Sequence, residues 1–137
     1  MPPLTPAQVA GLAGCLRLCA RLEKLDLRRC NIGDAGAEAL AKALPSMAAL
    51  SYLDLTGNAL GDEGAKALAK VLPSMAALES LVLEDNSLGD EGAKALARAL
   101  PAAPGLKTLY LDGNNMGEEA KAAVRTAWGD RGGLLQL

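Results

Sequence analysis

The stretch Leu50-Ser51-Tyr52-Leu53-Asp54-Leu55-Thr56-Gly57-Asn58-Ala59-Leu60 decides the fold of this 137-residue chain. Around Leu53-Asp54-Leu55, apolar and polar residues alternate, which is typical of a short strand with one buried side. The same pattern, Leu-x-x-Leu-x-Leu-x-x-(Asn/Cys)-x-(Leu/Ile/Met), begins at Leu22, Leu50, Leu78 and Leu106, which are 28 residues apart each time. A fixed period of this length predicts a solenoid of stacked repeats.

The second half of each repeat changes to a helical period. In residues 61–73, Asp62 is placed to cap a helix N-terminus, and Pro73 to end the helix. Apolar residues at i, i+3, i+4 and i+7 predict the buried stripe of that helix, namely Ala65, Leu68, Ala69 and Leu72. Residues 89–101 differ from 61–73 at only two positions, and residues 33–45 and 117–128 are looser copies.

Both ends of the chain fit the same register. Residues 1–21 are predicted to form an N-terminal capping helix over 6–20, with Thr5 as cap and Gln8 completing a capping box. Leu134 and Leu137 align with Leu106 and Leu109, so residues 134–137 are expected to begin a fifth strand. The sequence thus predicts one domain over 1–137, with repeats at 22–49, 50–77, 78–105 and 106–133.

The 28-residue period, the Leu-x-Leu-x-x-Asn strand and the Gly-Asp-Glu-Gly-Ala-Lys-Ala-Leu helix start together resemble the ribonuclease-inhibitor-like class of leucine-rich repeats over residues 22–116. The resemblance implies an α/β solenoid, a right-handed horseshoe arc. It also implies an asparagine ladder, formed here by Asn58, Asn86 and Asn114 with Cys30 in the same slot. Functions within this class differ, so the fold selects no partner.

The expected curvature has a simple geometric cause. Strands stack about 4.8 Å apart, whereas packed helices need about 8–10 Å. Parallel strands are therefore expected on the concave face and helices on the convex face.

Composition excludes several classes of function. Lys+Arg 14 against Asp+Glu 16 argues against a nucleic-acid partner, and no apolar stretch approaches the ~20 residues of a membrane span. The chain has no His, and Cys15 and Cys19 lack the further ligands that zinc needs. We therefore expect no catalysis, no cofactor and no metal. Three cysteines without a disulfide-like framework favour a reducing, cytoplasmic location.

Outward strand positions should form columns of equivalent residues on the concave face. Tyr and Arg are the most frequent energetic anchors of interfaces, and the face runs from basic in the first repeat to acidic in the third. The predicted protein-binding residues are Lys24, Asp26, Arg28, Arg29, Tyr52, Asp54, Thr56, Val82, Glu84, Asp85, Tyr110 and Asp112.

The sequence therefore predicts a noncatalytic protein–protein interaction module that binds a protein partner through its concave sheet. Two alternatives stay open. One is a regulator of an enzyme, such as a GTPase activator, which requires a rim loop that presents residues to a nucleotide site. The other is a structural module, self-assembling or designed, in which the edge strand Leu134 to Leu137 self-associates.

Overall fold

A computed structural model describes residues 4–137, in which strands and helices alternate along the chain. Three short 3-10 turns follow the middle helices: η1 (Leu44–Ser46), η2 (Leu72–Ser74) and η3 (Leu100–Ala102). The helices and strands in chain order are α1 (Pro6–Leu16), β1 (Lys24–Asp26), α2 (Gly33–Ala43), β2 (Tyr52–Asp54), α3 (Asp62–Val71), β3 (Ser80–Val82), α4 (Asp90–Ala99), β4 (Thr108–Tyr110), α5 (Glu118–Trp128) and β5 (Leu134–Gln136).

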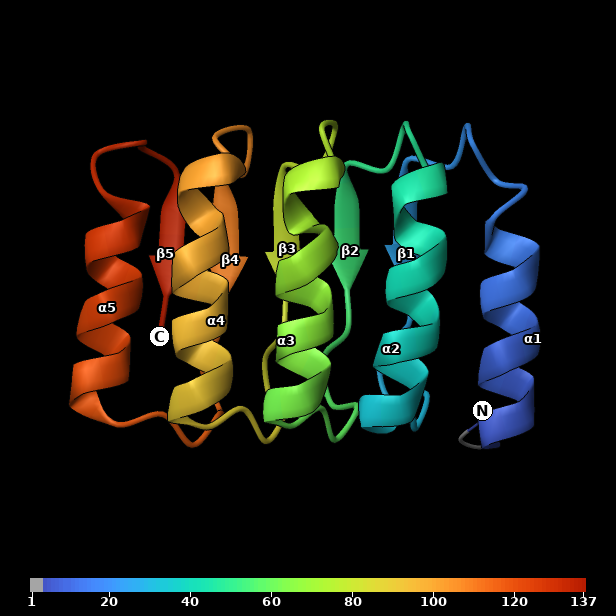
Figure 1. Ribbon diagram of the computed structural model, residues 1–137, viewed down its shortest axis with the longest axis horizontal. Helices are drawn as coiled ribbons and strands as arrows, with labels where there is room; N and C mark the ends of the chain where they lie inside the picture. The colour runs from blue at the N-terminus through green and yellow to red at the C-terminus, as the bar shows by residue number, and fades with distance from the viewer. Residues whose placement is uncertain (1–3) are drawn as a thin grey trace.

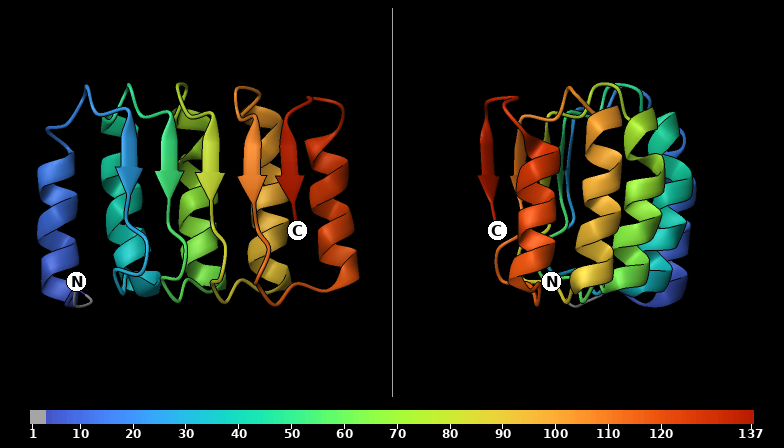
Figure 2. Two further views of the ribbon diagram at one scale, coloured as in Figure 1. Left: turned by 180° about the vertical axis from the view of Figure 1, so that it is seen from behind. Right: turned by 60° about the vertical axis from the view of Figure 1, so that its left-hand side comes forward.

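The five strands form one parallel sheet in the order β1-β2-β3-β4-β5, which confirms the α/β solenoid. Leu25 pairs with Leu53, and Leu53 with Leu81, so neighbouring strands are in register one repeat apart. Figure 1 shows the helices side by side over the sheet and more widely spread than the strands. The views in Figure 2 place the strands on the opposite side, along the inner face of the arc.

The core lies between the sheet and the helices. The inward strand positions Leu53 and Leu55 are buried, and so is the predicted helical stripe of α3. Alanines in this stripe allow each helix to pack closely on its neighbours and on the sheet. None of the helices described over residues 4–137 is long and apolar enough to cross a membrane.

The aspartate in the first turn of α2, α3 and α4 bonds the start of the next helix rather than its own, so the expected role of Asp62 is wrong. The N-cap of α3 is Gly61, which has no side chain to bond the first turn of the helix. The Asp62 carboxylate instead accepts hydrogen bonds from the backbone N–H groups of Gly89 (2.8 Å) and Gly92 (2.9 Å), one repeat further on. Asp34 bonds the start of α3 in the same way. Each aspartate therefore also ties two repeats together.

The N-terminal helix has the predicted capping box but is shorter than expected. Thr5 accepts a bond from the Gln8 N–H, and the Gln8 side chain accepts one from the Thr5 N–H. The helix ends at Leu16 instead of residue 20. Beyond that point the N–H groups of Leu18 and Cys19 bond carbonyls three residues back, which tightens the chain into turns.

The fifth strand exists, but its expected register is wrong by two residues. Leu135, and not Leu137, pairs with Leu109, so Leu134 faces outward and is 45% exposed. Glycines with positive φ after α5, at Gly129, Gly132 and Gly133, turn the chain early. This turn replaces the 3-10 segment that follows α2, α3 and α4.

The Arg131 side chain lies across the C-terminal ends of α4 and α5 and bonds backbone carbonyls of both. It donates hydrogen bonds to the carbonyl oxygens of Ala103 (2.8 Å), Leu100 (3.0 Å) and Trp128 (3.0 Å). Its guanidinium also lies 4.7 Å from the centroid of the Trp128 ring. Burial lowers the pKa of Arg131. The bonds from this one side chain therefore join the turn after α5 to the turn after α4.

Candidate functional site

The candidate residues lie in columns on the concave face of the sheet, which is the face opposite the helices, and on the turns just after the strands. Over residues 4–137 the helices all cover the other face, so this one has no covering layer (Figure 2). One column runs through Asp26, Asp54, Val82 and Tyr110, as the strand register requires. Residues 28, 56, 84 and 112 follow at the strand ends. The structure thus brings the predicted residues together on one surface.

The column positions differ in how much of each side chain reaches the surface. Lys24, Asp26, Arg28, Arg29 and Asp85 are exposed, and Tyr52, Glu84, Tyr110 and Asp112 are half-buried. Asp54, Thr56 and Val82 are only 5%, 9% and 5% exposed, which is less than outward strand positions suggested. Neighbouring columns cover them because strands stand close together on a concave surface. These three form the floor of the site rather than its rim.

At the N-terminal end of the face Arg28 is paired with Asp26, whereas Lys24 and Arg29 form no salt bridge in the described chain. The Arg28 guanidinium donates hydrogen bonds to both carboxylate oxygens of Asp26, at 2.8 to 3.1 Å, and lies 3.8 Å from the Asp54 carboxylate. These hydrogen bonds lower the pKa of Asp26. The basic character of this end is therefore partly neutralised before a partner arrives.

Asp54 is the centre of a second set of bonds. It accepts hydrogen bonds from the Tyr52 hydroxyl (3.0 Å), the Thr56 hydroxyl (2.6 Å) and the Thr56 N–H (3.0 Å). Burial raises the pKa of Tyr52, and the bond to the Asp54 carboxylate raises it further. The Tyr52 ring is therefore held in one orientation on the face, an arrangement that suits a rigid contact residue.

The C-terminal half of the face carries unpaired acids. Within the described chain, Glu84, Asp85 and Asp112 form no salt bridge. One carboxylate oxygen of Asp112 is buried and has no hydrogen-bond partner. Burial raises the pKa of Glu84, and the nearby carboxylates of Asp112, Asp85 and Asp54 raise it further. The acidic end of the predicted charge gradient therefore has no counter-charge within the described chain.

Glu84→Gln is expected to increase the free energy of unfolding at pH 7 but not below pH 4. The pKa of Glu84 is raised above its ordinary 4.5 in the folded chain, so ionisation disfavours folding once the pH exceeds that value. Urea unfolding at both pH values checks this. An equal gain at both would assign the effect to something other than the charge.

The turn after each strand holds one residue in the left-handed region. Two repeats use glycine there, Gly57 and Gly113, whereas the other two place Arg29 (φ 53°) and Asp85 (φ 51°). Gly57 lacks a side chain where the Arg29 side chain lies, since a Cβ would be 3.1 Å from its Cγ. Because glycine follows one repeat after each charged residue, the Arg29 side chain can lie over Gly57 and the Asp85 side chain over Gly113.

The chain contains no His, and among residues 4–137 no three His, Cys, Asp or Glu side chains are grouped so as to hold a metal ion. Gln136 is a face residue that the sequence pattern did not predict, because the register of β5 adds it to the Tyr110 column. Only the shortened fourth repeat, visible as the Gly132-Gly133 pair, could have indicated it.

Comparisons with known proteins agree with this architecture. Residues 19–41, 49–69 and 76–97 match the family model described as Leucine Rich repeat. No curated protein matches the chain. The tropomodulin C-terminal domain of Caenorhabditis elegans superposes with a TM-score of 0.79 at 17% identity, over 94% of this chain and 81% of that one. Actin-binding site 2 of leiomodin-1 gives 0.80 at 16%, over 98% and 80%. At such identity the likeness concerns the fold.

Proposed function

Because the chain is a leucine-rich repeat protein, we propose that it is a noncatalytic module that binds a protein partner through the concave face of its sheet. The observation that carries this proposal is that no helix covers the concave face of the five-stranded sheet in the described chain. Its outward residues number roughly 20, about one side of a standard interface.

The acidic half of the face favours a partner with basic groups. Arg28 is already bonded to Asp26, whereas Lys24 and Arg29 are exposed and form no salt bridge in the described chain, so the opposite half can still meet acidic groups. Glu84, Asp85 and Asp112 lack salt-bridge partners in the described chain, and a cation brought by another protein would satisfy them. Basic groups of the partner are therefore expected to face the C-terminal half of the sheet.

Two tyrosines are the preferred anchors. Tyr52 and Tyr110 are both half-buried on outward positions, two strands apart. Rings held in this way supply contact area at a low cost in side-chain entropy. The acids would thus orient the partner, and the tyrosines would hold it.

The setting proposed for this interaction is the cytoplasm, because Cys15, Cys19 and Cys30 are all unpaired. Actin is the first purified partner to test, since one of the similar solved structures is an actin-binding site. The shared fold supports only this choice of test partner.

Affinity capture from the native source tests the proposal. The wild-type chain is compared with Tyr52→Ala/Tyr110→Ala on the concave face and with Lys66→Ala/Lys94→Ala on the helices, and circular dichroism checks that each variant is folded. A protein retained by the wild type and the helix variant but lost by the tyrosine variant is expected. Equal retention by all three would move the binding surface elsewhere.

A second candidate function is self-assembly through β5. Leu134 is 45% exposed on that strand, and an apolar edge strand is a template for pairing. Light scattering over roughly 1–100 μM, the range of weak association, would show a rising mass that Leu134→Lys abolishes. A constant monomer mass would exclude it.

A further inference from the structure

One turn of the third repeat departs from the chain's own pattern. Residues 44–50 and 72–78 both read Leu-Pro-Ser-Met-Ala-Ala-Leu, whereas residues 100–106 read Leu-Pro-Ala-Ala-Pro-Gly-Leu. Ala103 therefore stands where the two preceding repeats have methionine, and Gly105 stands where they have alanine. The helices just before these turns are almost identical in repeats two and three, so the change is confined to the turn.

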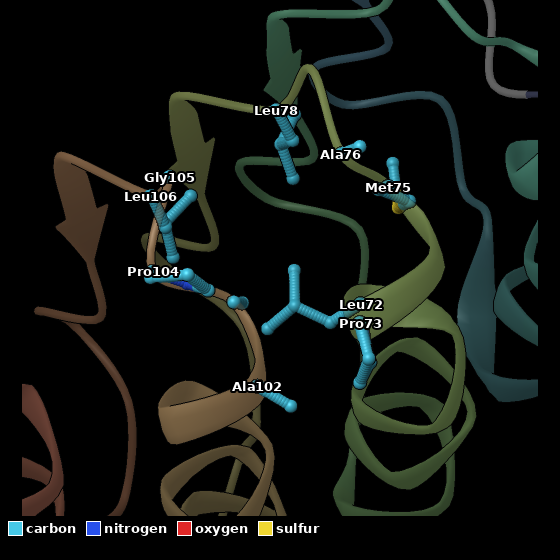
Figure 3. Close-up of a pocket in the computed structure, with 10 residues that line it drawn as sticks. Leu72, Pro73, Met75, Ala76, Leu78, Ala102, Pro104, Gly105 and Leu106 are labelled. Carbon is cyan, nitrogen blue, oxygen red and sulfur yellow. The ribbon is translucent and has the colours of Figure 1, made fainter.

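A cavity of about 190 Å³ lies where these side chains are missing. It is formed between the turn after α3 and the turn after α4, and Figure 3 shows the side chains around it. Its lining is apolar, with no charged side chain, and includes Leu72, Met75, Leu78, Ala103, Pro104 and Leu106.

The two methionines show what the missing side chain does. Met47 and Met75 have nearly the same backbone conformation, with φ −95°, ψ 71° and φ −97°, ψ 70°. Met47 is 3% exposed, whereas Met75, which lines the cavity, is only half-buried. The repeat that follows Met47 has methionine at the equivalent position, and the repeat that follows Met75 has Ala103. The shorter side chain accounts for both the cavity and the exposure of Met75.

We propose that this cavity binds one unbranched apolar side chain of a partner protein, of the methionine type. The chain itself uses methionine at the two equivalent positions, which identifies the shape that fits between such turns. The volume slightly exceeds the ~150 Å³ of a cavity that holds benzene, and it is below the ~300 Å³ of pockets for drug-sized ligands. One side chain is therefore the matching size.

The walls and the position of the cavity support a role in recognition. Pro73 and Pro104 fix the backbone of the two turns, so the cavity is formed in advance of binding. Leu78 and Leu106 lie just before β3 and β4, which places the cavity at the rim of the proposed binding face. The site thus extends the proposed function and rests on it only for the existence of a protein partner.

The test is a titration followed by NMR of ¹³C-methyl methionine. The probe is the peptide acetyl-Ala-Met-Ala-amide, and the matched control is acetyl-Ala-Val-Ala-amide. The methyl signal of Met75 is expected to shift saturably with the methionine peptide, with an affinity about tenfold above that for the valine peptide. The buried Met47 should stay unchanged. A Met75 signal that does not respond, or responds equally to both peptides, would overturn the proposal.

Two variants close the cavity. Ala103→Met restores the residue of the preceding repeats and is expected to raise the melting temperature and abolish the Met75 response. Gly105→Ala is the second variant, because its Cβ would be 3.6 Å from the nearest atom, the Ala76 oxygen, an ordinary contact. It is expected to weaken the response severalfold. An unchanged response in either folded variant would place the peptide elsewhere.

The result of the peptide titration can be distinguished from the result of the capture experiment on the concave face. Tyr52→Ala/Tyr110→Ala should leave the peptide titration unchanged, so loss of partner capture by that variant does not depend on the cavity. A particle mass that rises with protein concentration and falls back in Ala103→Met would assign the cavity to a second copy of the chain. That result would overturn the assignment to a separate partner.

Discussion

Asn58→Ala is expected to lower the free energy of unfolding by about 3–5 kcal/mol, because several buried backbone groups lose their partner at once. Asn58 is fully buried. Its side-chain oxygen accepts hydrogen bonds from the backbone N–H groups of Cys30 (2.9 Å) and Ile32 (3.2 Å). Its amide nitrogen donates to the carbonyls of Leu27 and Leu55, both at 2.9 Å. Alanine would leave these buried groups of two adjacent repeats without partners.

Urea unfolding of the wild type and the variant measures this loss. Asn115→Ala is the matched control, since Asn115 is exposed and no side-chain hydrogen bond is found for it. The control should change stability by less than about 0.5 kcal/mol. If both variants lost the same amount, the ladder would not be what joins the repeats.

Gly92→Ala is expected to lower the free energy of unfolding by about 1–3 kcal/mol, although alanine is the better helix former. A Cβ at Gly92 would be 2.8 Å from the Asp62 carboxylate, 2.9 Å from the Ala65 Cβ and 3.2 Å from the Asp62 Cα. The backbone and side chain of the preceding helix would have to shift, and the cap that joins the two repeats would be disturbed.

The same substitution at Gly14 should have the opposite sign. Gly14 lies within α1, and an added Cβ would meet nothing within 4 Å. Alanine there should raise stability by about 0.5–1 kcal/mol through helix propensity. Thermal unfolding of both variants provides the comparison. A stabilising effect at Gly92 would mean that the inter-repeat contact is not tightly packed.

The periodic part of the fold is predictable from the sequence because the signals for it are local. Leu53 and Leu55 alternate with polar residues, and the buried stripe of α3 follows the helical period, so each element specifies its own face. Cys30 fits the first slot of the ladder for a physical reason. Its sulfur bonds the Arg28 carbonyl within its own turn (3.4 Å), whereas the longer Asn58 side chain reaches backbone groups of two repeats.

Features that depend on contacts between repeats were harder to predict. Asp62 has the composition of a cap for its own helix, and only the three-dimensional stacking shows that the next helix lies within its reach. The register of β5 depends on left-handed glycines that shorten the turn. The burial of Asp54 and Thr56 depends on how closely neighbouring columns stand. In each case the deciding partner is about 28 residues away or in another column.

The candidate site was predictable as a surface but not as a set of charges. The alternation of apolar and polar residues along the strands placed Tyr52, Glu84 and Tyr110 on the concave face. The pairing of Arg28 with Asp26 and the orphaned oxygen of Asp112 emerge only from the geometry. The geometry therefore removes Arg28 from the free basic charges of the face, while Glu84, Asp85 and Asp112 keep their charges unpaired in the described chain.

The most direct test of the central claim is the dissociation constant of the captured partner for three folded chains. These are the wild type, Glu84→Gln/Asp112→Asn on the concave face, and Glu63→Gln/Glu91→Gln on the helices, so both variants lose two negative charges. The concave variant is expected to bind at least about tenfold more weakly, and the helix variant within about twofold of the wild type. Weaker binding by the helix variant alone, or equal binding by all three, would contradict binding through the concave face.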